Sequence, residues 1–275
     1  MLLAAGSAAG ACRTYLKYGD YSPMIGHGPP YAAVFDEHGI PIVRYPFGRF
    51  RNPATVAEWG LQEYSFWCLR GDREHLQTAV RAARWLANTQ TRGGWQYTFA
   101  YREGPVQLRP PWISALAQGR AISLLARVYD STHRPRFLRT ARRALNPFLL
   151  TFDEGGVLAH WDGHPWYEEY PGVNANHVLN GYEISLLGLH DFARRSRRAA
   201  RLLRAGVRSL VRAIPQFDGG PTGSYYAAGH FGPVGDGYLA VHVELTRKMY
   251  RITGRKILRR YAERWAAVLR SHRKS

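Results

Sequence analysis

Apolar side chains recur with a period of about 3.6 residues along most of the chain, a pattern that predicts amphipathic helices. Ile122, Leu125 and Tyr129 fall on one helical face, and Val241 and Leu245 do so nearer the C-terminus. The pattern predicts eight helices, over residues 56–70, 74–88, 112–130, 135–149, 177–193, 196–214, 238–252 and 255–271.

A pair of adjacent glycines recurs at residues 93–94, 155–156 and 219–220, with spacings of 62 and 64 residues. Each pair follows one predicted helix and precedes another, so the repeating unit is a helical hairpin joined to the next by a Gly-Gly turn. Because one hairpin cannot bury a core alone, we expect four of them to be arranged in a ring.

The predicted fold is therefore all-α, an incomplete α/α barrel or toroid of four hairpins, with apolar inner helices and basic, amphipathic outer helices. Short strands are expected in the loops that face a cleft at one end, at residues 95–101 and 224–230. We divide the chain into an extended N-terminal segment that packs on the barrel, residues 1–52, and the barrel domain, residues 53–275. An open helical solenoid is the alternative architecture.

Three polar residues repeat with the hairpins. Gln118, Asn180 and His242 lie 62 residues apart, each in the helix that follows a Gly-Gly turn. We expect them to occupy equivalent positions.

Charge is the feature of the composition that changes this picture. With 45% hydrophobic residues, the chain is an ordinary globular protein rather than a disordered or collagen-like one. It has 38 Lys and Arg against 20 Asp and Glu, a formal net charge of +18, and only four of the basic residues are lysines. Arginine binds carboxylates and sulfates bidentately, so an acidic polymer is the expected partner. Net charge alone does not separate polysaccharide from nucleic acid, and the arginines of residues 194–208 are also typical of a solvated helix face.

Other protein classes are disfavoured by motifs that the sequence lacks. No apolar stretch approaches the roughly 20 residues needed to cross a bilayer. Residues 1–12 contain no basic n-region of an export signal, which favours a cytoplasmic location. Nucleotide-binding and metal-binding motifs are absent, so we expect neither a cofactor nor a metal. We interpret Cys68 as a buried thiol and expect no chemistry from Cys12 or Cys68.

Candidate chemistry is concentrated in three segments that lie between hairpins and therefore face the expected cleft. The densest is residues 166–171, Trp-Tyr-Glu-Glu-Tyr-Pro, and the others are residues 224–230 and 237–242. Aromatic packing that closes the end of the barrel would explain any one of them alone. Together they indicate a site.

Tyrosines, a glutamate and arginines suit the removal of a proton next to a carboxylate. This chemistry needs a base at the carbon and groups that stabilise the negative charge developing on the carboxylate. Burial raises the pKa of a tyrosine, so only positive neighbours or hydrogen bonds to its phenolate could make it a base. Reprotonation on the opposite face would invert the centre, as in an epimerase, and loss of a leaving group would break the polymer, as in a lyase.

The same residues resemble the D-glucuronyl C5-epimerases, which convert glucuronate to iduronate within heparosan and heparan sulfate precursors. The resemblance implies an α/α barrel, no cofactor and a homodimer. Animal members carry a β-sandwich for which this chain has no room, so we expect a minimal helical form of bacterial origin. The resemblance rests on residues 53–65, 112–119, 166–171, 178–182 and 185–189 and on Tyr238 with His242.

Carried over position by position, the resemblance implies that Glu169 and Tyr170 form one catalytic pair and that Tyr238 is the second catalytic tyrosine, on the opposite side of the sugar ring. Tyr226 and His230 would be further active-site residues. The other expected substrate contacts are Tyr64, Tyr101, Trp112, Gln118, Trp166, Asn180 and His242.

This chain departs from the animal enzymes at two places. The arginine that precedes the active-site histidine is Gly229 here, so another cation must bind the substrate carboxylate, and Arg102 and Arg109 are the candidates. The His-Thr-Thr that follows the second tyrosine is replaced by residues 239–241, Leu-Ala-Val, so the substrate contacts there are expected to differ.

The sequence thus predicts a cofactor-independent isomerase, a uronyl C5-epimerase acting on an acidic, heparosan-like polysaccharide, with no nucleic-acid partner, metal or membrane span. Three alternatives stay open. One is a polysaccharide lyase with His230 or His242 as the proton donor, and another is a noncatalytic binder of acidic polymer. The third is a hydrolase that pairs Glu168 or Glu169 with Asp162.

Overall fold

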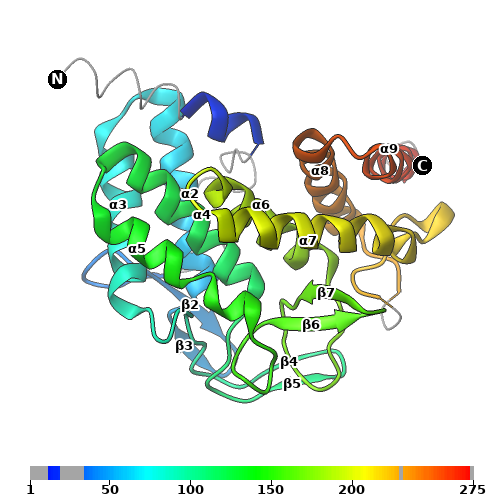
Figure 1. Cartoon of the computed structure of the whole chain (residues 1–275), viewed down its shortest axis with the longest axis horizontal. Helices are drawn as coiled ribbons and strands as arrows, with labels where there is room; N and C mark the ends of the chain where they lie inside the picture. The colour runs from blue at the N-terminus through cyan, green and yellow to red at the C-terminus, as the bar shows by residue number, and fades with distance from the viewer. Residues whose placement is uncertain (1–11, 19–33, 229–231, 273–275) are drawn as a thin grey trace.

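The computed structural model describes residues 12–18, 34–228 and 232–272, and these residues form a mainly helical molecule. Its long helices follow one another as four hairpins, which confirms the fold predicted from the hydrophobic period (Figure 1). The hairpins are α2 (Pro53–Arg70) with α3 (Arg73–Thr89), α4 (Ala115–Thr132) with α5 (Pro135–Arg143), α6 (Leu179–Ala193) with α7 (Arg197–Ala213), and α8 (Asp236–Thr253) with α9 (Lys256–His272).

Helix ends follow local sequence signals. Asn52 caps α2, because its side chain accepts hydrogen bonds from the backbone N–H groups of Ala54 and Thr55. Helix α5 is shorter than predicted, since Pro147 lacks an N–H donor and its ring would clash with the carbonyl four residues earlier. In the described segments between hairpins, 3₁₀ turns occur at η2 (Asn146–Leu149), η3 (Ile214–Phe217) and η4 (Gly220–Thr222).

The first helix of each hairpin belongs to an inner layer and the second to an outer layer. Helix α4 contacts both α2 and α6, and α6 in turn contacts α8. Helices α4 and α6 approach closely at two glycines, because a Cβ on Gly119 would collide with the backbone of Ser185 and one on Gly188 with the carbonyl of Gly119. The six arginines of α7 are all exposed on the outside, and that helix contains no acidic residue.

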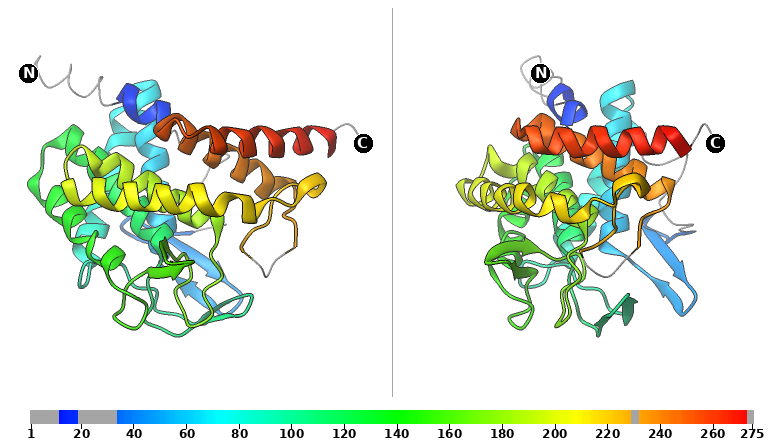
Figure 2. Two further views of the ribbon diagram at one scale, coloured as in Figure 1. Left: turned by 45° about the vertical axis from the view of Figure 1, so that its right-hand side comes forward. Right: turned by 90° about the vertical axis from the view of Figure 1, so that its right-hand side faces the viewer.

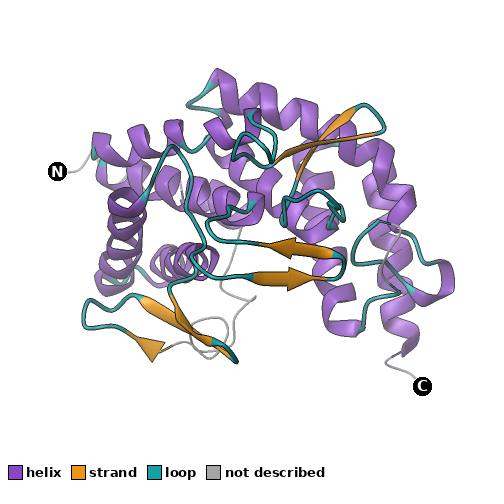
Figure 3. Ribbon diagram, turned by 90° about the horizontal axis from the view of Figure 1, so that it is seen from below, coloured by secondary structure: helices purple, strands orange, loops and turns teal. Residues whose placement is uncertain are grey.

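Short strands gather at one end of the helical array, as two views agree (Figure 2) and as the view onto that end shows (Figure 3). Residues 95–101 and 224–230 were predicted to be strands, and this is wrong for most of their length. Over their described parts they form isolated bridges, and a ladder begins only at Tyr101. The strands are β1 (Val34–Phe35), β2 (Pro41–Tyr45) and β3 (Gly48–Phe50) in one antiparallel sheet, and the hairpins β4 (Tyr101–Glu103) with β5 (Val106–Leu108) and β6 (Leu158–Trp161) with β7 (His164–Tyr167).

A short helix at residues 12–18 covers the opposite end of the array (Figure 2). The Tyr15 hydroxyl donates to Asp130 at 2.8 Å, and the guanidinium of Arg127 lies 4.6 Å from the Tyr15 ring centroid. Cys12 forms a disulfide with Cys68 near the end of α2. The expectation of a buried free thiol was therefore wrong, because helical periodicity cannot show that residues 56 positions apart meet at the same end of a barrel.

Replacing Cys68 with serine should lower the free energy of unfolding by about 2–4 kcal/mol, because the disulfide restricts the unfolded chain. Denaturant unfolding of wild type with and without a thiol reductant measures the effect. The Cys12→Ser/Cys68→Ser double variant is the control, and it should not respond to the reductant. Equal stability of oxidised and reduced wild type would contradict the prediction.

Glu183 is a fully buried carboxyl between α6 and α8, and it accepts a hydrogen bond from the Thr246 hydroxyl at 2.8 Å. Burial raises the pKa of Glu183 to about 8, against the weaker opposing effect of that hydrogen bond. An acid whose pKa is raised by folding binds its proton more tightly in the native state. Stability is therefore lost as the pH rises from about 4.5 through 8.

Glu183→Gln should thus exceed the unfolding free energy of wild type only slightly at pH 5 and by up to about 3 kcal/mol at pH 7. Thermal unfolding of both proteins across this pH range tests the prediction. Glu263→Gln, which changes an exposed side chain of α9, is the control and should show no such trend. A difference that stays constant with pH would rule out titration of Glu183 as its cause.

No helix of the described residues has the length and apolar character of a membrane span.

Candidate active site

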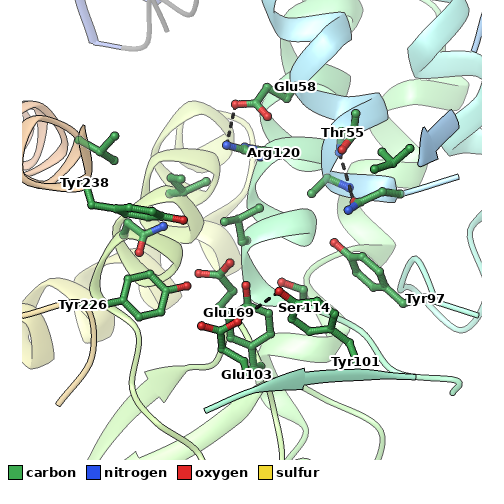
Figure 4. Close-up of a pocket in the computed structure, with 18 of the residues that line it drawn as sticks. Thr55, Glu58, Tyr97, Tyr101, Glu103, Ser114, Arg120, Glu169, Tyr226 and Tyr238 are labelled. Atoms are coloured by element: carbon green, nitrogen blue, oxygen red, sulfur yellow. Dashed lines mark hydrogen bonds and ion pairs between the residues drawn. The ribbon is translucent and has the colours of Figure 1, made fainter. Parts of the chain in front are cut away.

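A pocket of about 1230 Å³ opens at the end of the barrel that carries the strands. The first halves of α2, α4, α6 and α8 all contribute to it, together with β2 and the loops between hairpins. It therefore lies where the N-terminal ends of the inner helices meet the cleft-side loops. The titratable and aromatic residues that line it are Arg44, Tyr45, Glu58, Tyr97, Phe99, Tyr101, Glu103, Trp112, Arg120, Glu169, Tyr170, Tyr226 and Tyr238. Figure 4 shows how Glu58, Arg120, Glu169, Tyr226 and Tyr238 lie around it.

The β6–β7 hairpin delivers the Glu169-Tyr170 pair to this pocket. Its turn is Asp162-Gly163, and both residues have positive φ angles, as a two-residue type I′ turn requires. Immediately after β7, the backbone of Glu168 donates to Val157 at 2.8 Å and accepts from Ala115 at 2.9 Å. These two bonds fix the chain between the hairpin and the start of α4, so the next residue faces the pocket.

Glu169 is buried, and a Cβ on Gly181 would collide with its carboxylate, so the glycine makes room for it. Burial raises the pKa of Glu169 to about 7. Hydrogen bonding from Tyr170 and the charge of Arg120 oppose this rise, whereas the nearby carboxylate of Glu103 adds to it. A carboxyl with this pKa can both accept and return a proton near neutral pH.

Three tyrosines connect Glu169 to the far side of the pocket. Tyr226 is hydrogen-bonded to Tyr170, and the rings of Tyr226 and Tyr238 meet edge to face with centroids 5.4 Å apart. Burial, followed by the charge of Glu169, raises the pKa values of Tyr170 and Tyr226. Both phenols therefore carry their protons at neutral pH. Tyr238 is 48% exposed at the start of α8.

An aromatic wall forms another side of the pocket. Trp112 stacks on Tyr97 at 3.9 Å between centroids, and Tyr101 stacks on Tyr170 at 5.7 Å. The Tyr101 hydroxyl donates to Glu103 at 3.2 Å. Burial raises the pKa of Glu103, against the opposing effect of that hydrogen bond. Flat aromatic faces with a few polar groups are typical of small-ligand sites.

Seven of the fourteen expected site residues line the pocket, and their roles stay predictions. Two of them come from the inner helices α6 and α8, and the other five come from the segments between helical hairpins. His230 lies outside the described residues. The seven are Tyr101, Trp112, Glu169, Tyr170, Asn180, Tyr226 and Tyr238.

Four expected substrate contacts lie away from the pocket and have internal partners. Tyr64 is bonded to Ser131, at 2.9 Å, towards the end covered by residues 12–18. Trp166 stacks on a neighbouring tyrosine in the core, at 3.6 Å. The Gln118 amide donates to the carbonyl of Gly93 at 3.0 Å and so fixes the first Gly-Gly turn.

His242 is the fourth, and it is bonded to Ser224 at 2.8 Å. Burial lowers its pKa to about 3, so the ring is neutral. Gln118 and His242 are thus enclosed, whereas Asn180 opens on the pocket. The expected equivalence of these three residues was wrong, because they lie at different positions of their helices. Gln118 is the fourth residue of α4, His242 the seventh of α8 and Asn180 the second of α6.

The two expected carboxylate-binding arginines are exposed and do not line the pocket. Arg102 lies on β4 between Tyr101 and Glu103, and alternation along a strand turns it to the other face. Arg109 lies in the loop after β5 and is also exposed. The structure also does not support the hydrolase alternative. Asp162 lies at the exposed turn of the β6–β7 hairpin and does not line the pocket that contains Glu169.

Sequence reasoning missed the cations and two of the acids of the pocket. Arg44 comes from β2, and Arg120 from α4, where its guanidinium lies 2.7 Å from a carboxylate oxygen of Glu58 on α2. A usable signal exists for Glu58 and Arg120, since each is the only charged residue in the first half of its inner helix. In the described part of the chain, no group of histidine, cysteine or acidic side chains has the arrangement of a metal site.

Solved structures of low sequence identity share the fold. A cellobiose 2-epimerase from Bacillus thermoamylovorans superimposes with a TM-score of 0.58 at 9% identity, over 96% of this chain and 74% of that one. A glycoside hydrolase family 76 mannosidase from Bacteroides thetaiotaomicron gives a TM-score of 0.55 at 14% identity, over 94% and 71%. Both likenesses concern the α/α toroid alone.

Sequence relatives are more specific. A D-glucuronyl C5-epimerase from Caenorhabditis elegans is 34% identical over 216 residues, which are 70% of this chain and 35% of that protein. An uncharacterized protein from Methanocaldococcus jannaschii is 29% identical over 178 residues, 62% of this chain and 56% of that protein. The chain thus spans about a third to a half of these relatives. Residues 88–267 match the family described as D-glucuronyl C5-epimerase C-terminus, and the chain belongs to this family.

Proposed function

We propose that this protein is a uronyl C5-epimerase, a cofactor-independent isomerase that converts D-glucuronate to L-iduronate in an acidic, heparosan-like polysaccharide. One observation carries the proposal. In a chain of the C5-epimerase family, a single pocket brings Tyr226 and Tyr238 together with the Glu169-Tyr170 pair (Figure 4).

In the proposed reaction, the C5 proton passes to a base on one face of the uronate. The electron pair of the broken C–H bond delocalises into the adjacent carboxylate, which becomes an enediolate. A proton from the group on the other face then completes the inversion. Tyr170, backed by Glu169, serves one face, and Tyr238 serves the other.

The ionised Glu169 carboxylate can accept the phenol proton of Tyr170, and this allows Tyr170 to act as a base. The Tyr170 phenol has a raised pKa and holds its proton at neutral pH, so it cannot accept the C5 proton until it has lost its own. When Tyr170 passes its own proton to the Glu169 carboxylate, it can receive the proton from C5. The pKa of Glu169, about 7, makes this transfer feasible at neutral pH.

The polar groups of the pocket suit a ligand rich in hydroxyl groups. Within the described residues, one carboxylate oxygen of Glu58 and the amide oxygen of Asn180 are buried and have no hydrogen-bond partner. Both residues line the pocket. Buried acceptors are costly to leave unpaired, and sugar hydroxyls would donate to them.

Incubation with heparosan and with its N-sulfated form in D₂O tests the proposal. Deuterium at C5, with iduronate signals and unchanged chain length, is the expected result. New 4,5-unsaturated ends would identify a lyase instead, and tight binding without deuterium incorporation would identify a noncatalytic binder. We also expect the homodimer that the resemblance implies, which sedimentation measures.

A further inference from the structure

A buried ion pair lies at the wall of the pocket, between the first two inner helices. Glu58 of α2 and Arg120 of α4 are 5% and 7% exposed, and their charged atoms are 2.7 Å apart. Both residues line the pocket (Figure 4). The pair therefore touches the site although neither residue was expected there.

Such a pair adds little to the free energy of unfolding, because the cost of removing two charges from water is about as large as their mutual attraction. The chain contains a second buried pair that shows what a fully satisfied one looks like. Asp191 accepts hydrogen bonds from two nitrogens of Arg127 and from Ser123, and the Arg127 charge and these bonds hold its pKa below the usual value.

Glu58 differs from Asp191 in each respect. Its Oε2 is buried without a hydrogen-bond partner among the described residues, and Arg120 is the cation beside it. Burial raises the pKa of Glu58 despite that arginine. The Glu58–Arg120 pair is thus incompletely satisfied at the edge of a pocket, whereas the Arg127–Asp191 pair is complete and away from it.

We propose that Arg120 binds the carboxylate of the uronate and that the substrate replaces Glu58 as its principal counter-ion. This inference rests on the proposed function and names the residue that selects a uronate over a neutral sugar. A guanidinium presents five N–H donors in a planar fork, so it can bind an incoming carboxylate bidentately.

Position and burial favour Arg120 over Arg44, the other arginine that the described residues contribute to the pocket. Arg44 is exposed on β2 and lies opposite Arg49 in the sheet. Arg120 is enclosed, and its charge acts on Glu169, since it lowers the pKa of that carboxyl. A charge in a water-poor site attracts an anion more strongly than an exposed one.

The same placement would help the reaction. C5 is bonded directly to the carboxylate carbon, so a carboxylate held by Arg120 brings C5 to the neighbourhood of Glu169 and Tyr170. Negative charge grows on the carboxylate oxygens as the C5 proton leaves. A fixed cation at those oxygens stabilises this charge without having to reorganise.

The test compares two oligosaccharides that differ only at C6, one with glucuronate and one with glucose. Their dissociation constants are measured by calorimetry. Wild type should prefer the glucuronate form by about 10- to 100-fold, as expected for charge-assisted hydrogen bonds. Arg120→Gln alone would leave Glu58 buried without its cation, so the Glu58→Gln/Arg120→Gln double variant is used, and it should bind both forms equally.

Two further variants sharpen the result. Glu58→Gln removes the competing anion and should strengthen binding of the glucuronate form by about threefold or more. Arg102→Gln changes an exposed arginine outside the pocket and is the matched control, with the wild-type preference expected.

A preference that survives in the double variant, or that Arg44→Gln abolishes instead, would overturn the assignment. So would a wild type that binds both forms equally. If the preference depends on Arg120 but no deuterium enters C5, the carboxylate site stands and the proposed epimerisation fails.

Discussion

Replacing Tyr238 with phenylalanine should lower the rate of C5 inversion by about 10²–10⁴-fold, the contribution of a positioned acid or base. Only the hydroxyl is removed, and the residue is half-exposed at the start of α8, so the fold should be unaffected. The edge contact with the Tyr226 ring is available to phenylalanine as well. Deuterium incorporation and thermal unfolding measure the two effects separately.

The two-face mechanism also predicts which C5 epimer can still exchange its proton in the Tyr238→Phe variant. One of the two C5 epimers presents its C5 proton to the Glu169-Tyr170 pair, which Tyr238→Phe leaves intact. That epimer should still exchange its proton with D₂O, without inversion, whereas the other epimer should exchange very slowly. A loss of exchange from both epimers would mean that Tyr238 does more than serve one face.

Tyr225→Phe is the matched control. Tyr225 precedes an active-site tyrosine in the same loop but does not line the pocket. It forms a bridge with Pro233 through its backbone, which the substitution preserves. Inversion at the wild-type rate is expected. Wild-type activity in Tyr238→Phe would remove Tyr238 from the mechanism.

Hydrophobic period was enough to predict the helices of the four hairpins, apart from the end of α5, because inner and outer helices both keep one face against the core. It did not predict the helix at residues 12–18, a segment expected to be extended. The predicted helix over residues 196–214 is observed as α7 (Arg197–Ala213). The predicted strand at residues 95–101 failed for a physical reason. Its aromatic side chains are buried by stacking around the pocket, as Tyr97 on Trp112 shows, and this does not require a strand ladder.

The β6–β7 hairpin was missed although its signal is in the sequence. Asp162-Gly163 between short aromatic segments is a strong indication of a two-residue hairpin turn. The β6–β7 hairpin positions Glu169 and Tyr170 in the pocket. The unpredicted element is therefore the one that holds two of the expected catalytic residues. The Cys12–Cys68 disulfide, by contrast, depends on a long-range meeting that no local pattern reports.

The site itself was predictable to the extent that loop residues carry it. The resemblance implies Glu169, Tyr170 and Tyr238, and these three residues line one pocket. Glu58 and Arg120 were not predicted as site residues, because the period of an inner helix does not tell which of its residues lies at a cavity. Each is the only charged residue in the first half of its helix, and this pattern is the signal for them in the sequence.

Replacing Glu169 with glutamine should lower the C5 exchange that the Glu169-Tyr170 pair serves by about 10²–10⁴-fold and remove the ionisation near pH 7 from its rate profile. Glutamine cannot take the proton that Tyr170 must release. In wild type the carboxylate form is needed for that step, so the exchange served by this pair should rise with pH up to about 7 and level off above it.

Other charges facing Glu169 set the midpoint of this profile, which gives a control. Arg120 and the Tyr170 hydrogen bond lower the pKa of Glu169, whereas Glu103 and Glu168 raise it. Glu103→Gln removes one of these anions and should move the midpoint to lower pH while an ionisation is still present. If Glu169→Gln keeps the ionisation, the group that titrates is another one, and the proton transfer from Tyr170 to Glu169 is not part of catalysis.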